Sequence, residues 1–496
     1  MKHAVGPVIA VVFIIAAVCG PSMPALSADF IQVPAVIHIH TTFSSGSYTI
    51  DELVEKAAAE GIGCLVLTDH DRVEMEYGLF PFRNIVKAWE SRPSVLSAGA
   101  GKYLDAIFTV NARQKNVLVI PGVQSSPFYY WTGIPLPGKL TAHDFRKELL
   151  ILGMDSPGDY RGLPIMNNGP SLRYTMELLP GFLAFAAAFA GFLLLSRYPG
   201  HAGRFGMVLA VFSFLLMIDN LPFKSSLYDA YHGDRGIAPF QEEIDYANQH
   251  GGLVFWAHPE SNYSPKGRSF GPIRLETPPY TDALFDSDNY TGFSAIYGDE
   301  ITFTTPGAGW DQLLAAFCRG ERKRPPVGIA GADFHMEYGG EKLDTYQTVC
   351  LVHEKSARQI LDSLARGRCY ALFKKKGACM VLDRFGLADE KSGRTAVMGQ
   401  ILTAVGGSVI SGRISASDNG RYPIRLRLVC DGRVVREISD ETPVVFSTLF
   451  PKTTGQPLAF CRLDAESPAL GRLLSNPVFV KLNGLGKSPS AALREP

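Results

Sequence analysis

The sequence lacks an excess of charge of either sign, closely spaced cysteine pairs and internal repeats. Its Lys and Arg residues number 48, as do its Asp and Glu residues, so nothing indicates a nucleic-acid partner. Its 8 cysteines include no C-x-x-C pair, which argues against a zinc site made of thiolates. The chain shows no long low-complexity tract, and its 496 residues exceed one ordinary domain. We therefore expect roughly two to four folded units.

Residues 1–28 have the layout of a secretory signal peptide. Lys2 precedes an apolar run and then small residues, with cleavage expected after Ser27 or Ala28. Export of the chain would follow. A lipoprotein signal at Cys19 is an alternative, although the A-A-V before this cysteine matches such a signal poorly.

Two apolar stretches, 178–195 and 205–221, are each close to the length of a bilayer span and contain no Lys, Arg or Glu. The short loop between them, R-Y-P-G-H-A-G-R, is basic, and positive residues in short loops stay in the cytoplasm. Residues 178–222 are therefore predicted to form a transmembrane hairpin with both flanks outside. The alternative is a hairpin buried within a soluble protein. Apolar side chains on all faces of both segments argue against it.

The stretch 36–46, V-I-H-I-H-T-T-F-S-S-G, predicts a buried strand that ends in a polar loop. Because strand side chains alternate between faces, His38 and His40 are expected on the same side, where both imidazoles can bind one ion. Taken alone, the pair has another interpretation, in which one histidine packs in the core and the other caps a turn.

Further polar groups follow other predicted strands. Asp69 and His70 follow strand 63–68, and His258 follows strand 252–257. Asp333 and His335 follow strand 327–330. Helices are predicted between such strands, at 49–60, 99–114, 241–250, 311–318 and 356–366, and further strands at 116–121, 149–152, 293–297 and 369–373.

Alternating strands and helices of this kind imply a parallel sheet, whose ligand sites lie beyond the carboxyl ends of the strands. Roughly seven strand and helix units suit a barrel. Crowded imidazoles and carboxylates are costly without a cation, so a metal centre is expected. Nitrogen and oxygen ligands favour Zn, Mn or Fe. The aromatic run 128–131 could line a pocket, but anchoring of a loop is the preferred interpretation.

From about residue 399 onward, short alternating strands and turn signals such as D-N-G predict an all-β sandwich. Its strands are expected at 408–414, 424–430, 434–438 and 477–482. Cys430 and Cys461, both in this part, are the first pair to consider for a disulfide. Residues 486–496 are expected to be a disordered tail.

Several motifs together resemble those of the PHP (polymerase and histidinol phosphatase) superfamily. They are His38-Ile39-His40-Thr41, Thr68-Asp69-His70-Asp71, Pro121-Gly122-Val123, Ala257-His258-Pro259 and Asp333-Phe334-His335. The resemblance implies a distorted (β/α)7 barrel over 29–177 and 223–395, interrupted by the hairpin and followed by the sandwich at 396–485. The final domain, with G-R-C-Y and S-N-P-V-F-V, is similar to the branch that includes carbaryl hydrolase.

The resemblance also implies a ligand set for up to three metals. One metal would be held by His38, His40 and Asp333, a second by His258, and a third by His70 and His335. Asp69 would orient His70 or carry a proton, which makes it the candidate catalytic residue.

Two positions depart from the family pattern. Gln124 stands where the family usually has a bridging glutamate, and an amide can lend one oxygen but no bridging anion. Ser45 stands where an aspartate is often found. One to three divalent ions are therefore expected, with Gln124 as a neutral ligand. His143 and Glu148 could each supply a compensating metal ligand, but a surface role is favoured for each.

The resulting hypothesis is a metal-dependent hydrolase at the bacterial inner membrane, with its barrel and sandwich in the periplasm and lipid around its hairpin. It would cleave a small phosphate ester, or a related ester or carbamate, with a metal-activated water. The alternative is a non-catalytic binding or sensing module with a degenerate metal site.

Overall fold

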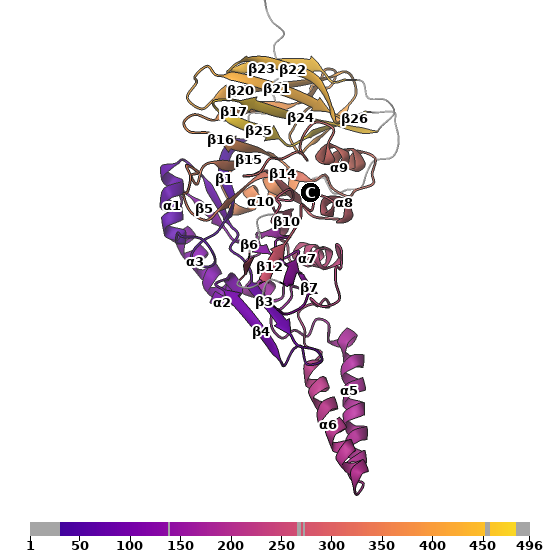
Figure 1. Ribbon diagram of the computed structural model, residues 1–496. Coiled ribbons are helices and arrows are strands. Elements are labelled where there is room, and N and C mark those ends of the chain that lie inside the picture. Colours follow the sequence, from indigo (N-terminus) through magenta and orange to yellow (C-terminus); the bar gives the residue numbers. More distant parts are fainter. Residues whose placement is uncertain (1–29, 137–138, 265–268, 271–272, 452–456, 483–496) are drawn as a thin grey trace, which may run out of the picture.

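The computed structural model describes residues 30–136, 139–264, 269–270, 273–451 and 457–482. The expected signal peptide and C-terminal tail lie outside the described residues. Figure 1 shows a mixed α/β body, a β-rich C-terminal part at one end of it, and a helical hairpin that projects from the other end. The hairpin consists of α5 (Thr175–Leu195) and α6 (His201–Asp219).

The body is built on strands whose pairing closes on itself. In order of pairing they are β1 (Ile31–Ile39), β2 (Cys64–Leu67), β5 (Leu118–Ile120) continued by β6 (Gly122–Ser125), β9 (Leu149–Leu152), β10 (Leu253–Trp256), β13 (Gly292–Ile296) and β14 (Val327–Phe334). The last of these pairs with β1 again. All neighbours are parallel except β9, which is antiparallel to both β6 and β10.

Alternate side chains of these strands form an apolar core inside the cycle. Ala35 and Ile37 of β1, Val66 of β2 and Phe255 of β10 belong to this core, and Leu364 of α10 (Ala357–Arg366) packs against it. The intervening residues face the surrounding helices. Burial on both faces explains why the strands read as continuous apolar runs.

The helices around the body confirm the predicted positions to within a few residues. The longer ones are α1 (Ile50–Ala59), α3 (Ala100–Arg113), α7 (Ala238–Gln249) and α9 (Gly309–Cys318), and the short ones are α2 (Val95–Ala98), α4 (Pro157–Arg161) and α8 (Ala283–Asp286). α1 shows why these segments are helical. Thr49 and Glu52 form a capping box at its start, and Leu53 and Ala57 lie on its buried stripe.

Two small sheets on the body were not predicted. One is the hairpin of β3 (Val73–Gly78) and β4 (Lys87–Arg92). The other contains β7 (Tyr130–Gly133), β8 (Leu140–His143), β12 (Ile273–Glu276) and β11 (Ser269–Phe270). The aromatic run at 128–131 leads into β7, and Phe128, Tyr129 and Trp131 are buried, in keeping with an anchoring role.

The C-terminal part contains two sheets with apolar residues between them. The first continues from β1 through β15 (Tyr346–Val352), β16 (Cys369–Lys374), β25 (Gly471–Ser475), β24 (Leu458–Ser467), β26 (Val478–Leu482) and β19 (Ile401–Ala404), with β21 (Pro423–Cys430) and β22 (Arg433–Glu441) paired beside β24. The second consists of β18 (Thr395–Val397), β17 (Met380–Asp389), β20 (Ser408–Ala416) and β23 (Val444–Leu449). The disulfide between Cys430 and Cys461 is confirmed and joins β21 to β24.

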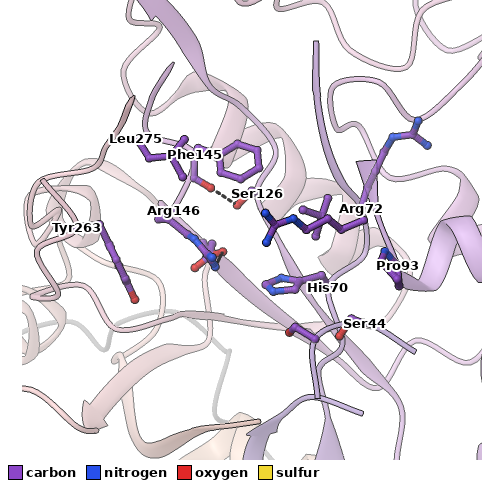
Figure 2. Close-up of a pocket in the computed structure, with 13 residues that line it drawn as sticks. Ser44, His70, Arg72, Pro93, Ser126, Phe145, Arg146, Tyr263 and Leu275 are labelled. Carbon is purple, nitrogen blue, oxygen red and sulfur yellow. Dashed lines mark hydrogen bonds and ion pairs between the residues drawn. The ribbon is translucent and has the colours of Figure 1, made fainter. Parts of the chain in front are cut away.

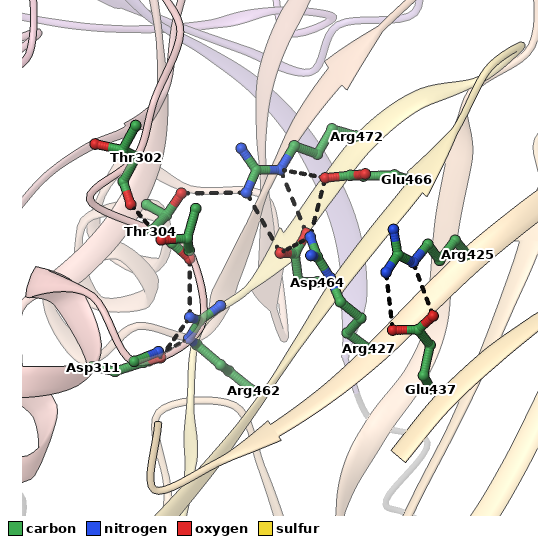
Figure 3. A network of polar contacts seen from close by, with 12 residues as sticks. Thr302, Thr304, Asp311, Arg425, Arg427, Glu437, Arg462, Asp464, Glu466 and Arg472 are labelled. Atoms are coloured by element: carbon green, nitrogen blue, oxygen red, sulfur yellow. Dashed lines mark hydrogen bonds and ion pairs between the residues drawn. The ribbon is translucent and has the colours of Figure 1, made fainter. Parts of the chain in front are cut away.

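A buried ion pair fastens the C-terminal part to the body (Figure 3). Arg462 of β24 is 0% exposed and donates from Nε and Nη2 to the carboxylate of Asp311 on α9, at 2.6 and 2.8 Å. Its Nη2 also donates to the carbonyl of Thr304 at 3.0 Å. Because both charged groups have lost their water, each depends on the other to remain buried.

The two hairpin helices are long and apolar enough to cross a membrane, by length and composition alone. No residue of α5 is buried, and α6 buries mainly small residues such as Gly203, Gly206 and Ala210. A hairpin enclosed in a soluble core, the alternative interpretation, is therefore not what the structure shows. Asp219, the acid at the end of α6, is buried and accepts backbone hydrogen bonds from Asn84 and Ile85.

Candidate metal centre

A bulge in β1 sets which way His38 and His40 face at the carboxyl end of this strand. Ile37 packs inside the closed cycle of strands, whereas Ile39 packs outside it, so simple alternation fails between them. His38 has φ of 73°, and the pairing of β1 with both neighbours shifts register at this point. The ring centroids of His38 and His40 lie 5.4 Å apart, and the bulge decides which side the two rings face.

Two further site residues have the same unusual backbone. His258 follows β10 with φ of 25°, and Asp333 lies in β14 with φ of 45°. Positive φ is costly for residues other than glycine and tends to persist where the surrounding structure holds a functional geometry.

The carboxylate of Asp333 is the central group of the cluster. Its Oδ1 lies 3.2 Å from Nε2 of His38, 3.5 Å from Nε2 of His40 and 3.3 Å from Nε2 of His335. The Asp333 side chain is 41% exposed, so it also reaches the open side of the centre. One carboxylate thus contacts three imidazoles, as a bridging metal ligand would.

On the other side of Asp333, His258 meets two groups that come from different strands. Its Nε2 lies 3.2 Å from Oε2 of Glu148 and 3.3 Å from Nε2 of Gln124. The rings of His38 and His258 stack with centroids 5.6 Å apart. His38, His258 and Asp333 place their donor atoms within 4.8 Å of one another, and so do His40, Asp333 and His335.

Four polar atoms in this cluster are buried and make no hydrogen bond of good geometry in the described part of the chain, although three of them face a carboxylate or an imidazole at 3.2–3.5 Å. They are His38 Nε2, His40 Nε2, Gln124 Oε1 and Glu148 Oε2. A buried polar atom without a partner costs on the order of 1–3 kcal/mol. Cations between these atoms would satisfy all four, so the donor set fits one or two divalent ions bound by nitrogen and oxygen.

The remaining predicted ligands lie beside these two groups of donors. His70 is buried, and its ring centroid lies 4.6 Å from that of His40. Gln124 lies on β6, where it pairs with His70 in an isolated bridge. The structure therefore brings His38, His40, His258, Asp333 and His335 together, with His70 and Gln124 adjacent.

Asp69 holds the loop that follows β1. Its carboxylate accepts hydrogen bonds from the backbone N–H of Thr41 at 2.7 Å, the Thr41 hydroxyl at 2.8 Å and the Ser44 hydroxyl at 2.6 Å. The Ser44 hydroxyl also lies 3.4 Å from Nδ1 of His40, and Ser45 Oγ lies 3.1 Å from Nδ1 of His335. The two serines thus contact the outer nitrogens of two histidines and can fix their ring orientations.

The position of Glu148 differs from the sequence prediction. The surface role favoured for it is wrong, because its side chain is 3% exposed and contacts His258. Since β9 is antiparallel to β10, the start of β9 lies beside the end of β10, and the residue before β9 reaches the metal centre. His143 lies instead on β8, where its polar contacts are with Thr132 and Glu276.

The environment keeps part of the cluster in the neutral form that binds metal. Burial lowers the pKa of His38 to about 3 and also lowers the pKa values of His40 and His70. Burial acts in the same direction on His258, but Glu148 outweighs it and raises the pKa of His258. Asp333 similarly raises the pKa of His335.

A cavity of about 620 Å³ adjoins the cluster, and His70 and Glu148 are part of its wall. Figure 2 shows the side chains of Arg72 and Arg146 extending into this space around His70. Arg146 Nη1 lies 3.5 Å from Oε1 of Glu148, so one arginine contacts both the cavity and a group of the metal centre. Each guanidinium pairs with a glutamate, Arg72 with Glu74 and Arg146 with Glu148, and each keeps further N–H donors from which an anionic occupant can accept hydrogen bonds.

Comparison with known proteins gives a family match for part of the chain. No curated protein matches the chain. A solved two-domain protein from Bacteroides vulgatus, described as containing a predicted PHP-like metal-dependent phosphoesterase, is 13% identical, with a TM-score of 0.37 and coverage of 92% of this chain and 97% of that one. A proposed metal-dependent phosphoesterase from Bifidobacterium adolescentis is 16% identical, with a TM-score of 0.28 and coverage of 66% and 96%. Residues 37–126, which contain five of the predicted site residues, match the PHP domain family.

Proposed function

We propose that the protein is a metal-dependent hydrolase of phosphate esters, or of related esters and carbamates. The observation that carries the proposal is the Asp333 carboxylate shared between two groups of imidazoles, together with four buried polar atoms of the same cluster that make no hydrogen bond within the described residues. His38, His258, Asp333 and Glu148 would hold one ion, with the amide oxygen of Gln124 beside it. A second ion would be held by His40, Asp333 and His335, with His70 nearby. The proposed fold for this centre is the distorted seven-stranded PHP barrel, with a C-terminal sandwich like that of the carbaryl-hydrolase branch.

The chain itself supplies binding and orientation. Bound divalent ions would supply an activated water and stabilise developing negative charge. Arg72 and Arg146 would bind the anionic group of the substrate from the cavity side and hold it against the centre. Asp69 holds Thr41 and Ser44, and through Ser44 the ring of His40. A proton-carrying role for Asp69 is also proposed. Its hydrogen bonds to Thr41 and Ser44 support a role in orienting these two residues.

The hairpin is proposed to anchor the enzyme in a bacterial inner membrane. The basic loop between α5 and α6, with Arg197 and Arg204, would lie in the cytoplasm, which puts the body and the C-terminal part in the periplasm. The disulfide between Cys430 and Cys461 supports this orientation, because disulfides persist in oxidising compartments.

The test is a double substitution at the bulged strand. His38→Ala with His40→Ala should remove bound metal and turnover together, measured by elemental analysis and by hydrolysis of 4-nitrophenyl phosphate, bis(4-nitrophenyl) phosphate and a naphthyl carbamate. His143→Ala, a histidine of the same body outside the centre, is the matched control and should leave both unchanged. Full metal content and full activity in the double variant would refute the assignment.

A second candidate is a binding or sensing module with a degenerate site, and Gln124 is the observation that favours it. Gln124→Glu separates the two functions. An enzyme adapted to glutamine should lose activity or change little, because Glu148 already supplies a carboxylate to His258. A decayed site should instead gain metal and rate with the new carboxylate.

A further inference from the structure

The tip of the β3–β4 hairpin carries a set of large apolar side chains that the protein leaves exposed. Phe80 is 82% exposed, Trp89 66% and Leu79 50%, and Ile85 and Val86 are also exposed. Contiguous exposed apolar residues mark a surface that contacts something other than water. The tip, defined here as residues 79–86, and Trp89 on the adjoining strand β4 are not part of the metal centre.

The tip packs against α6, which fixes its position relative to the apolar helices. The backbone N–H groups of Asn84 and Ile85 donate to Oδ1 of Asp219 at 2.7 and 3.2 Å, and the Asn84 side chain donates to the Asp219 carbonyl at 2.7 Å. Farther along the helix, the rings of Phe82 and Phe212 meet with centroids 5.4 Å apart. In Figure 1 the tip lies beside the end of α6 that enters the body.

These contacts determine how deep the tip would lie in a bilayer that α6 crosses. Phe212 precedes Asp219 by two helical turns, which is about 10 Å along the axis at roughly 1.5 Å per residue. If α6 crosses a bilayer and ends near Asp219, the ring of Phe82 must lie about that far below the outer end of the helix. The neighbouring apolar residues of the tip are then at the depth where lipid headgroups meet acyl chains.

We propose that the tip of the β3–β4 hairpin enters the outer interface of the lipid bilayer beside α6. The inference rests on the proposed membrane hairpin. Leu79, Phe80 and Val86 would contact acyl chains, whereas Trp89 and Lys87 would lie at the boundary with water, where such side chains are preferred. The bilayer is the favoured occupant because the patch adjoins α6, which together with α5 forms an apolar and largely exposed hairpin.

The inserted tip would also fix how the catalytic cavity faces the membrane. Arg72, Val73, Arg92 and Pro93, at the other end of this β-hairpin, line the cavity beside the metal centre. A second cavity, of about 390 Å³, shares Arg72 with the first and reaches Asn84, Lys87 and Lys224. This polar groove along β3 would therefore open at the level of the lipid headgroups.

Trp89 provides a specific test, because the chain has only 4 tryptophans and none lies in α5 or α6. Trp131, Trp256 and Trp310 are buried in the body. The full-length protein is placed in nanodiscs of ordinary phosphatidylcholine or of phosphatidylcholine brominated near the top of its acyl chains. The Trp89 signal is the difference between wild type and Trp89→Phe, and bromination should reduce it by about half or more if the indole lies in the interface.

A second variant separates failure of the tip from failure of the membrane hairpin. In Trp89→Phe with Phe182→Trp, the new indole lies on α5 about 10 Å from the start of the helix, at roughly 1.5 Å per residue, and should be quenched if the helices cross the bilayer. Quenching there without quenching of Trp89 would overturn the inference alone. Quenching at neither position would overturn the proposed anchor as well. Trp89 that stays unquenched while Phe80→Cys crosslinks two molecules would show that a second copy covers the tip.

Discussion

Replacement of Glu148 by glutamine tests whether this residue supplies the negative charge that Gln124 cannot. The side chain keeps its shape, but the carboxylate 3.2 Å from His258 Nε2 becomes neutral. Two unit charges about 4 Å apart interact by roughly 4 kcal/mol at an effective dielectric constant of about 20. Because every 1.4 kcal/mol is about tenfold in an equilibrium constant, Glu148→Gln should weaken divalent metal binding by on the order of a thousandfold. Arg146, which now contacts Glu148, would keep its positive charge and oppose the ion further.

The assay is titration of the metal-free protein with Zn²⁺ and Mn²⁺ in the presence of a competing chelator. Glu243→Gln is the matched control, because Glu243 is also a fully buried glutamate but pairs with Ser125 rather than with a histidine. The control should bind metal within a few-fold of wild type. A Glu148→Gln protein that remains folded by circular dichroism and binds metal as tightly as wild type would refute a ligand role for Glu148.

Two further predictions concern the interface with the C-terminal part and the dependence of metal binding on pH. Arg462→Met should lower the free energy of unfolding by about 3–5 kcal/mol, because it leaves Asp311 buried without its partner. Urea denaturation measures this, with Arg425→Met as the control, since the exposed pair of Arg425 and Glu437 should contribute at most about 1 kcal/mol. Metal affinity should fall as pH drops through the raised pKa values of His258 and His335, because protons compete for both imidazoles, by roughly tenfold per pH unit and per proton. His38 adds no competition above its pKa of about 3, so affinity that is flat between pH 8 and about 5 would contradict the assignment.

Much of the site could be predicted because strand ends are readable in sequence. Short apolar runs followed by histidine or aspartate located His38, His258 and Asp333 without any knowledge of the fold. The shared edge of a parallel sheet then implied that these residues meet. Alternation alone would have pointed His38 and His40 away from the inner core that holds Ile37, and the bulge that corrects this has no strong signal in V-I-H-I-H.

What sequence could not supply was the direction of individual strands. The segment 149–152 reads as an apolar strand whichever way it runs, and only its antiparallel pairing with β10 places the preceding Glu148 at the centre. The β3–β4 hairpin was missed for a related reason. Polar and apolar residues alternate only weakly along it, because β4 is exposed over its whole length. Its outer part is also held by Asp219, which lies on α6, far away in the sequence.

The charge of the candidate metal centre depends on the neutral residues Gln124 and Ser45 and on the carboxylate of Glu148. Gln124 and Ser45 reduce the negative charge that the family pattern would bring, which on its own would suggest a weak or absent metal site. Glu148 restores one carboxylate, and it does so next to His258, the same imidazole that Gln124 approaches. Within this cluster the carboxylate therefore comes from the residue before β9, whereas β6 contributes a neutral amide. Since Arg146 on the same segment contacts both this carboxylate and the cavity, residues two positions apart would set the charge near the proposed ions and near the proposed substrate. That coupling favours a centre adapted to bind ions and an anionic substrate together over a site that has lost its function.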